Sequence, residues 1–327
     1  MKKIAVLTSG GDAPGMNACI RAVVRCANHY ELDVHGVLRG YDGLINGNFI
    51  PLDGRSVSNI IQKGGTILKS ARSEAFRTKE GRKKAYQQLQ DNGIEGLIGI
   101  GGDGTFTGLK IFSEEYDIPT IGVPGTIDND LFGTDFTIGY DTGVNTALDA
   151  IDKIRDTADA HDRIFFIEVM GRNTGHIAVR SAIAGGAEMA IIPENRVPAE
   201  GVIKRIIASE DGEVKFSHII VVAEGHTPGY AQELGDKTKQ ALPDHDIRVT
   251  MLGHIQRGGS PSTSDRVLAS RLGVAAVEGL LADKTKVMVG IINKKLHYTS
   301  LTDAIEKEKP LNVELVRLVE ILNGRIL

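Results

Sequence analysis

The sequence predicts an α/β fold built on a parallel sheet. Across the first half of the chain, short apolar runs alternate with segments whose apolar residues recur at helical spacing, a pattern typical of parallel strands joined by helical crossovers. Three of these runs lead directly into loops rich in Gly and Asp, namely SGGDAPG, GGDGT and PGTIDND. The carboxyl ends of parallel strands lie at one edge of the sheet, so we expect the three loops to share that edge. Ligands bind outside this edge in such sheets.

The apolar patterns also locate the individual elements. In the first half we expect strands at 4–8, 34–38, 94–100 and 118–123, and helices at 16–29, 56–62, 80–92 and from Thr105 to Phe112. A long helix at 139–161 is expected to cross into a second domain. In the second half we expect strands at 163–169, 189–192, 217–223, 246–252 and 287–292, and helices ending at Ala184 and spanning 199–209, 230–242, 263–281 and 312–322.

Bulk properties narrow the function classes. The 327 residues, with 41% hydrophobic and 24% charged content, suit a soluble globular protein of two domains or of one large domain. A net charge of −4 gives no reason to expect affinity for nucleic acid or membranes. The apolar run after Met1 is too short for a signal peptide, and Cys19 and Cys26 are expected to be buried reduced thiols. We therefore expect a cytoplasmic protein.

Two acidic loops are candidates for chemistry. Asp103 lies among glycines and can hold Mg²⁺, which takes few protein ligands, although an Asp-Gly turn is common in any protein. Asp128 can act as a general base toward a hydroxyl, with Asp130 nearby to orient it; the alternative is a polar surface turn. SGGDAPG is equally consistent with an anion-binding loop and with a compact strand-to-helix turn.

Cationic side chains gather at or near predicted strand ends. They are Arg163, Arg172, Arg248, His254 and Arg257. Guanidinium groups match phosphate geometry, and several of them beside glycine turns indicate anion binding, whereas Arg72 and Arg77 fit a phosphate clamp or a solvated loop. The pattern predicts a nucleotide site with Mg²⁺, a site for a phosphorylated substrate, and an Asp base between them, as phosphoryl transfer to a hydroxyl requires.

The motifs SGGDAPGMNA, GGTILKSAR, IGGDGT, PGTIDND, EVMGR and GHIQRGGSP, in this order, resemble those of bacterial-type ATP-dependent 6-phosphofructokinases over essentially the whole chain. PGTIDND and GHIQRGG are highly specific. The resemblance implies two Rossmann-like three-layer α/β domains with mainly parallel sheets and an active site in the cleft between them. It also implies a larger ATP-binding domain at 1–139 plus 256–305 and a smaller fructose 6-phosphate-binding domain at 140–255 plus 306–327.

The resemblance further implies transfer of the ATP γ-phosphoryl group to the 1-hydroxyl of fructose 6-phosphate, with Asp128 as base, Thr126 contacting the transferred group and Arg172 neutralising charge. The ATP–Mg²⁺ positions are Gly11, Arg72, Ser73, Gly102, Asp103, Gly104 and Thr105, with Asp103 as the metal position. The sugar-phosphate positions are Thr126, Ile127, Asp128, Arg163, Met170, Gly171, Arg172, Glu224, Arg248, His254, Ile255, Gln256 and Arg257. Arg163 and Arg248 match residues that reach in from a neighbouring subunit, which implies a homotetramer.

Two glycines bear on the phosphoryl donor. Pyrophosphate-using relatives typically carry Asp at the position of Gly104 and Lys at that of Gly125, so glycine at both positions favours ATP. The alternatives are a pyrophosphate-dependent phosphotransferase and a non-catalytic sugar-phosphate sensor. A sensor would be expected to have lost Asp103, Asp128 or Arg172. An NAD or lipid kinase would share GGDGT but leave the other motifs unexplained.

The chain departs from the family pattern at the effector site, which binds ADP or phosphoenolpyruvate between subunits. The matching positions are Arg21, Ala22, Val23, Val24, Arg25, Arg155, Gly186, Ala187, Glu188 and Lys215. Gly54 replaces an Arg, while Glu213, Phe216 and Ser217 replace cationic residues. Because the loss of cations weakens an anion site, the sequence predicts weak or altered regulation. Ser73 replaces an aromatic residue near the adenine.

Overall fold

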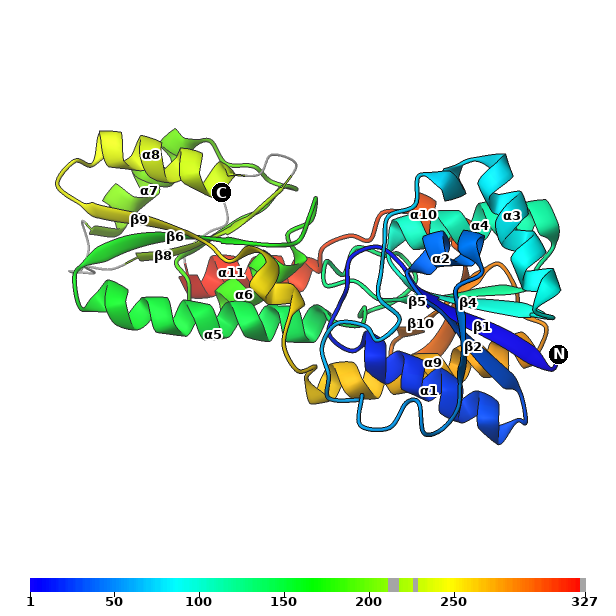
Figure 1. Ribbon diagram of the computed structural model, residues 1–327. Helices are drawn as coiled ribbons and strands as arrows, with labels where there is room; N and C mark the ends of the chain where they lie inside the picture. Colours follow the sequence, from blue (N-terminus) through cyan, green and yellow to red (C-terminus); the bar gives the residue numbers. More distant parts are fainter. Residues whose placement is uncertain (211–217, 226–228, 324–327) are drawn as a thin grey trace. The chain divides into compact units, whose positions relative to one another are not determined.

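The computed structural model describes residues 1–210, 218–225 and 229–323. The chain forms two compact units, shown in Figure 1. The larger contains Met1–Ile127, Leu131–Thr142 and Arg257–Lys309, and the smaller contains Asp128–Asp130, Gly143–Gln256 and the chain from Pro310. The sequence patterns had not indicated that Asp128–Asp130 groups with the smaller unit.

The larger unit is organised around a mainly parallel sheet. Within the described residues its strand order is β11-β10-β5-β4-β1-β2-β3, and only the edge strands β3 and β11 pair antiparallel. The strands are β1 (Lys3–Thr8), β2 (Asp33–Val37), β3 (Phe49–Leu52), β4 (Gly96–Gly101), β5 (Thr120–Pro124), β10 (Val287–Ile292) and β11 (Lys295–Ser300).

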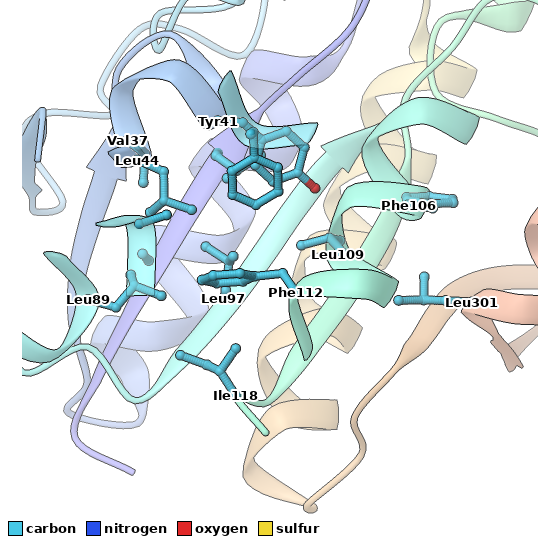
Figure 2. Packing of buried hydrophobic residues seen from close by; sticks show 14 of the residues in the cluster. Val37, Tyr41, Leu44, Leu89, Leu97, Phe106, Leu109, Phe112, Ile118 and Leu301 are labelled. Atoms are coloured by element: carbon cyan, nitrogen blue, oxygen red, sulfur yellow. The ribbon is translucent and has the colours of Figure 1, made fainter. Parts of the chain in front are cut away.

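Helices cover both faces of this sheet (Figure 1). On one face lie α1 (Met16–His29) and α9 (Thr263–Leu281); on the other lie α2 (Gly40–Asn46), α3 (Lys79–Asp91), α4 (Asp103–Tyr116) and α10 (Leu301–Glu306). Figure 2 shows the second face, where Tyr41, Leu97 and Phe112 pack in one buried cluster. Alternate strand residues supply it, as the two-residue period of a strand requires.

The smaller unit has a four-stranded parallel sheet among its described residues, in the order β7-β8-β6-β9. Its strands are β6 (Arg163–Val169), β7 (Met189–Ile191), β8 (His218–Ala223) and β9 (Asp246–Met251). Its helices are α5 (Tyr140–Asp159), α6 (His176–Ala184), α7 (Ala199–Glu210), α8 (Tyr230–Ala241) and α11 (Val313–Asn323). Figure 1 shows α7 and α8 on one face of the sheet and α5, α6 and α11 on the other.

The expected helix at 56–62 is wrong, because turns occupy this stretch. The carboxylate of Asp53 accepts hydrogen bonds from the backbone N–H groups of Arg55 and Ser56 at 2.9 and 2.7 Å. Such local side-chain acceptors compete with helix formation. The sequence patterns also missed α2, β3, β11, α10 and two short 3₁₀ helices, η1 (Ala75–Arg77) and η2 (Gly253–Arg257).

Each sheet has a point at which the order of its strands reverses. In the larger unit this point lies between β1 and β4, because the chain runs outward through β2 and β3 and then returns to β4 and β5. In the smaller unit it lies between β6 and β9. Ligands bind at such switch points, beyond the carboxyl ends of the strands.

Both cysteines, Cys19 and Cys26, are buried free thiols, as predicted. Burial raises the pKa of the Cys26 thiol to about 11, and the Glu278 carboxylate adds to this shift. Among the described helices, none is long and apolar enough to span a membrane.

Candidate active site

Backbone and hydroxyl contacts join the three glycine-rich loops of the larger unit at its switch point. Ser9 N donates to Ile100 O at 3.1 Å, and Thr105 Oγ1 donates to Ser9 O at 3.1 Å. Gly125 N donates to Gly101 O at 2.9 Å, which attaches the loop after β5. The ends of β1, β4 and β5 therefore share one edge, as the loop positions predicted.

Gly11 lies directly against the side chain of Arg257. A Cβ atom at position 11 would lie 1.8 Å from Arg257 Nη1, and this nitrogen donates to Asp12 O at 3.5 Å. The glycine is therefore explained by the close approach of the guanidinium group. A predicted nucleotide-loop residue and a predicted sugar-phosphate residue thus meet within the larger unit.

Asp103 is half-buried in the first turn of α4, where Gly102 is the N-cap. A Cβ atom at the neighbouring Gly104 would meet nothing within 4 Å, so the space beside the helix N-terminus is open. Among the described residues, no cluster of three His, Cys, Asp or Glu side chains can hold a metal ion. A single carboxylate beside open space fits Mg²⁺ that retains water and phosphate ligands.

The loop at 63–73 is held by a buried side chain that the motif analysis did not single out. Asn17 Nδ2 donates to the carbonyls of Lys63 and Gly64 at 3.1 Å, and its Oδ1 accepts from Ile67 N at 2.7 Å. Arg72 is exposed in this loop. Ser73 Oγ accepts from Phe76 N, in the short helix η1, at 3.3 Å.

The PGTIDND loop passes from one unit into the other, since Thr126 and Ile127 belong to the larger unit and Asp128–Asp130 to the smaller. In the smaller unit, Arg172 Nη1 lies 3.9 Å from Asp130 Oδ2. Thr174 Oγ1 donates to Asp128 O at 3.4 Å. The loop after β6 therefore contacts the acidic end of PGTIDND, and Asp128 is only 6% exposed.

Hydrogen bonds bring three loops together at the end of β6. Met170 N donates to Gln256 Oε1 at 2.8 Å across the switch point, and Arg172 N donates to Glu224 Oε1 at 2.8 Å. Arg172 has a left-handed backbone with φ 54°, a conformation that costs energy for a residue other than glycine and clusters at functional sites. Gly171 is buried, whereas His254 and Ile255 are exposed on η2.

Arg163 and Arg248 lie elsewhere in the same unit. Both pair with the Asp246 carboxylate. Arg163 Nε lies 2.6 Å from Asp246 Oδ2, and Arg248 Nε lies 2.8 Å from Asp246 Oδ1. Arg163 begins β6, whereas Arg172 follows its end. Seven strand residues separate the two ends by roughly 20 Å, so Arg163 and Arg172 of one chain do not share a phosphate group.

Glu168 is a buried carboxylate beside this site that the sequence analysis did not select. Its Oε2 accepts from Ala231 N at 3.2 Å, at the start of α8. Burial raises the pKa of Glu168, and the negative charge of Glu224 raises it further. The only signal was its place in EVMGR, one residue before the end of an apolar strand that is buried on both faces.

The two glycines thought to favour ATP differ in their surroundings. A Cβ atom at Gly125 would lie 3.0 Å from the side chain of Ile100 and 3.2 Å from that of Met16. Packing against these buried residues accounts for Gly125. Of the two, Gly104 is the position that adjoins open space.

The predicted effector residues fall in both units. On α1, Ala22, Val23 and Val24 have buried side chains, while Arg25 is exposed and its Nη2 donates to Gly54 O at 3.0 Å. In the smaller unit, Arg155 Nη2 donates to Gly186 O at 2.9 Å. Ala187 is fully buried, and Glu188 Oε2 accepts from Ile219 N at 2.6 Å. Glu213, Lys215, Phe216 and Ser217 lie outside the described residues.

The two sheets and their loops define a two-unit α/β protein with glycine-rich and charged loops at its switch points. The sequence model described as phosphofructokinase matches residues 3–280. The chain belongs to the phosphofructokinase family.

Curated relatives match along the entire chain. An ATP-dependent 6-phosphofructokinase of Cytophaga hutchinsonii is 66% identical over 325 residues, which cover 99% of each chain. An ATP-dependent 6-phosphofructokinase 1 of Thermus thermophilus is 56% identical, over 98% of this chain and 99% of the relative.

Solved structures agree with the fold. The phosphofructokinase of Saccharomyces cerevisiae superimposes with a TM-score of 0.88 at 34% identity, covering 99% of this chain and 47% of the yeast chain. A pyrophosphate-dependent phosphofructokinase of Marinobacter aquaeolei gives a TM-score of 0.86 at 23% identity, covering 100% of this chain and 88% of the other, and supports the fold alone.

Proposed function

We propose that the chain transfers the γ-phosphoryl group of ATP to the 1-hydroxyl of fructose 6-phosphate, forming fructose 1,6-bisphosphate and ADP in glycolysis. The observation that carries the assignment is the contact between the PGTIDND loop and the loop after β6. Arg172 lies 3.9 Å from Asp130, and Thr174 contacts the Asp128 backbone. A base and a cation thus lie in adjoining loops, as phosphoryl transfer requires.

Asp128 accepts the proton of the 1-hydroxyl as its oxygen attacks the γ-phosphorus and the bond to ADP breaks. Thr126 contacts the transferred group, and Arg172 neutralises the charge that develops on it. Met170, Gly171 and Glu224 orient the sugar phosphate. Arg257 supplies a further positive charge for its phosphate group.

Mg²⁺ is the expected metal, and Asp103 would hold it together with phosphate oxygens and water. When bound, Mg²⁺ neutralises charge on the β- and γ-phosphates. Gly102, Gly104 and Thr105 offer backbone groups and space to the nucleotide at the start of α4, where the helix N-terminus favours negative charge. Gly11 offers its backbone from the loop between β1 and α1.

The active form is a homotetramer whose sites are completed by Arg163 and Arg248 of a neighbouring subunit. The roughly 20 Å of strand that separates Arg163 from Arg172 in one chain supports this arrangement. Light scattering coupled to size exclusion is expected to give four times the mass of the 35.1 kDa chain; a fully active monomer would refute it.

The chemistry is tested by initial rates with fructose 6-phosphate and either Mg-ATP or Mg-pyrophosphate. We expect turnover with ATP, and a fall in kcat of roughly 10²- to 10⁴-fold for Asp128→Asn. Asp149→Asn, at an exposed carboxylate on α5, is the matched control. Turnover with pyrophosphate alone would identify the other phosphotransferase. Sugar-phosphate binding without turnover would identify a sensor, and full activity of Asp128→Asn would refute the assignment of the base.

The effector site is proposed to respond weakly to ADP and phosphoenolpyruvate. A Cβ atom at Gly54 would lie 3.4 Å from Arg25 Nη1, and the guanidinium group of Arg25 is bonded to the backbone carbonyl of Gly54. Gly54→Arg would add a second positive charge beside Arg25 and is expected to strengthen both effects. Strong, saturable ADP activation of the wild-type chain at an affinity unaffected by Gly54→Arg would contradict the proposal.

A further inference from the structure

A buried carboxylate in the larger unit remains outside the proposed chemistry. Asp265 lies in the first turn of α9 and is 1% exposed. Its Oδ1 accepts from Gly139 N at 2.8 Å, and its Oδ2 accepts from Thr142 N at 2.8 Å and from Thr142 Oγ1 at 2.5 Å. The amides belong to the start of α5, so the carboxylate of one helix caps the N-terminus of another.

A serine completes this junction between α9 and α5. Ser262 caps α9 by accepting from Asp265 N at 3.2 Å. Its own N–H donates to Thr142 Oγ1 at 2.9 Å, and its hydroxyl donates to Asp141 Oδ2 at 2.6 Å. The start of each helix is thereby fixed to the start of the other, and the geometry depends on an acceptor with two oxygens at position 265.

The segment held by Asp265 runs beside the PGTIDND loop. Ile138 N donates to Pro124 O at 2.9 Å, and Thr137 Oγ1 donates to Thr126 O at 2.6 Å. Ile138 also forms a parallel bridge with Gly125. Thr137 and Ile138 therefore hold the PGTIDND loop, and the next residue, Gly139, donates its backbone N–H to Asp265. A continuous series of hydrogen bonds leads from α9 to the backbone of Thr126.

We infer that Asp265 is a positioning residue for phosphoryl transfer: through residues 137–142 it fixes the backbone of Thr126, and hence the hydroxyl that contacts the transferred group. The inference rests on the proposed function. The carboxylate acts through the loop and not on the substrate. Its removal is therefore expected to affect the transition state more than the binding of either substrate.

The test compares Asp265→Asn with Asp303→Asn. Asp303 is a matched control, because it occupies the same position in α10 and its N–H donates to the capping Ser300 at 2.9 Å, but its carboxylate is exposed and pairs with Lys307. For Asp265→Asn we expect kcat to fall roughly 10- to 100-fold, with each KM within about threefold of wild type. Asp303→Asn should keep the wild-type kcat.

A double-mutant cycle with Thr137→Val separates positioning from general loss of stability. Thr137→Val removes the hydroxyl that bonds to Thr126 and keeps the side-chain size. If Asp265 acts through this segment, the fold-loss of kcat in the Asp265→Asn/Thr137→Val double variant is clearly less than the product of the two single-variant losses. Fully multiplicative losses, or an unchanged kcat in Asp265→Asn, would overturn the inference. An inactive wild type would instead refute the proposed function.

Discussion

The carboxylate of Asp246 holds the guanidinium group of Arg163, with Arg163 Nε 2.6 Å from Asp246 Oδ2. Arg248 bonds to the other oxygen of the same carboxylate. Hydrogen bonds from Arg163, and then from Arg248, hold the pKa of Asp246 below its ordinary value of 3.8. The two cations that we assign to a neighbouring subunit's site are therefore kept together by a single anion.

Asp246→Asn is expected to raise the KM for fructose 6-phosphate severalfold, because both guanidinium groups lose the charge-assisted hydrogen bonds that hold them. The KM for ATP should not change, since the arginines are assigned to the sugar phosphate. Steady-state kinetics measure both values, with Glu233→Gln, at an exposed carboxylate of α8, as control. Equal changes in both KM values would contradict the prediction.

Gly11→Ala is expected to displace the Arg257 guanidinium with little effect on folding. The added Cβ atom would conflict only with the flexible end of that side chain. We expect a melting temperature within a few degrees of wild type and a roughly 10-fold higher KM for fructose 6-phosphate. In the Gly11→Ala/Arg257→Ala double variant, the alanine at position 11 should add no further loss; an additional 10-fold loss would show that Gly11 acts independently of Arg257.

Gly104→Asp is expected to leave the fold intact and to impair the use of ATP. The new side chain enters open space, and an acidic residue in the first turn of α4 stabilises the helix dipole by about 0.3–1 kcal/mol. The same carboxylate repels a triphosphate. Thermal melts should therefore show no loss of stability while the KM for ATP rises at least 10-fold, with Gly104→Ala much nearer wild type. An unchanged KM for ATP in Gly104→Asp would exclude Gly104 from the nucleotide site.

The Arg82–Glu115 pair is expected to make stability depend on pH. Arg82 is nearly buried and donates to Glu115 at 2.6 and 2.7 Å, which holds the pKa of Glu115 below its ordinary value of 4.5. A lowered folded-state pKa gives stability that is present above pH 4.5 and is lost as the pH falls through the folded value.

Glu115→Gln should therefore cost about 1 kcal/mol at neutral pH, given the partial exposure of Glu115. In acid the difference from wild type should disappear. Urea unfolding at pH 7 and pH 3 measures both, with Glu114→Gln as the neighbouring exposed control. A loss of equal size at both pH values would contradict the electrostatic explanation.

Apolar periodicity predicted the buried elements well, because burial is what creates the pattern. The strand expected at 163–169 is β6, with the same bounds. In contrast, β11 is a largely exposed edge strand with the polar sequence KLHYTS, and it follows a turn in which Asn293 and Lys294 have φ of 51° and 67°. A two-residue turn of this kind is signalled most strongly by Asn-Gly or Asp-Gly, so its sequence gave no indication of a hairpin.

Motifs indicated candidate site residues that carry charge near strand ends, since the carboxyl ends of the strands converge in any parallel sheet. They did not predict the residues that fix the loops. Asn17 lies in a helix and bonds to a loop 46 to 50 residues away, and Asp265 bonds to residues more than 120 positions earlier. Contacts at such separation depend on the tertiary fold and leave no local pattern.

The distance along β6 between Arg163 and Arg172 has a genetic consequence if each site draws on two chains. A chain carrying Arg163→Ala inactivates the active site of its neighbour, whereas a chain carrying Asp128→Asn inactivates its own active site. When the two chains assemble together, some sites receive both defects and others receive neither. Two inactive gene copies in one cell would then restore part of the activity that each lacks alone.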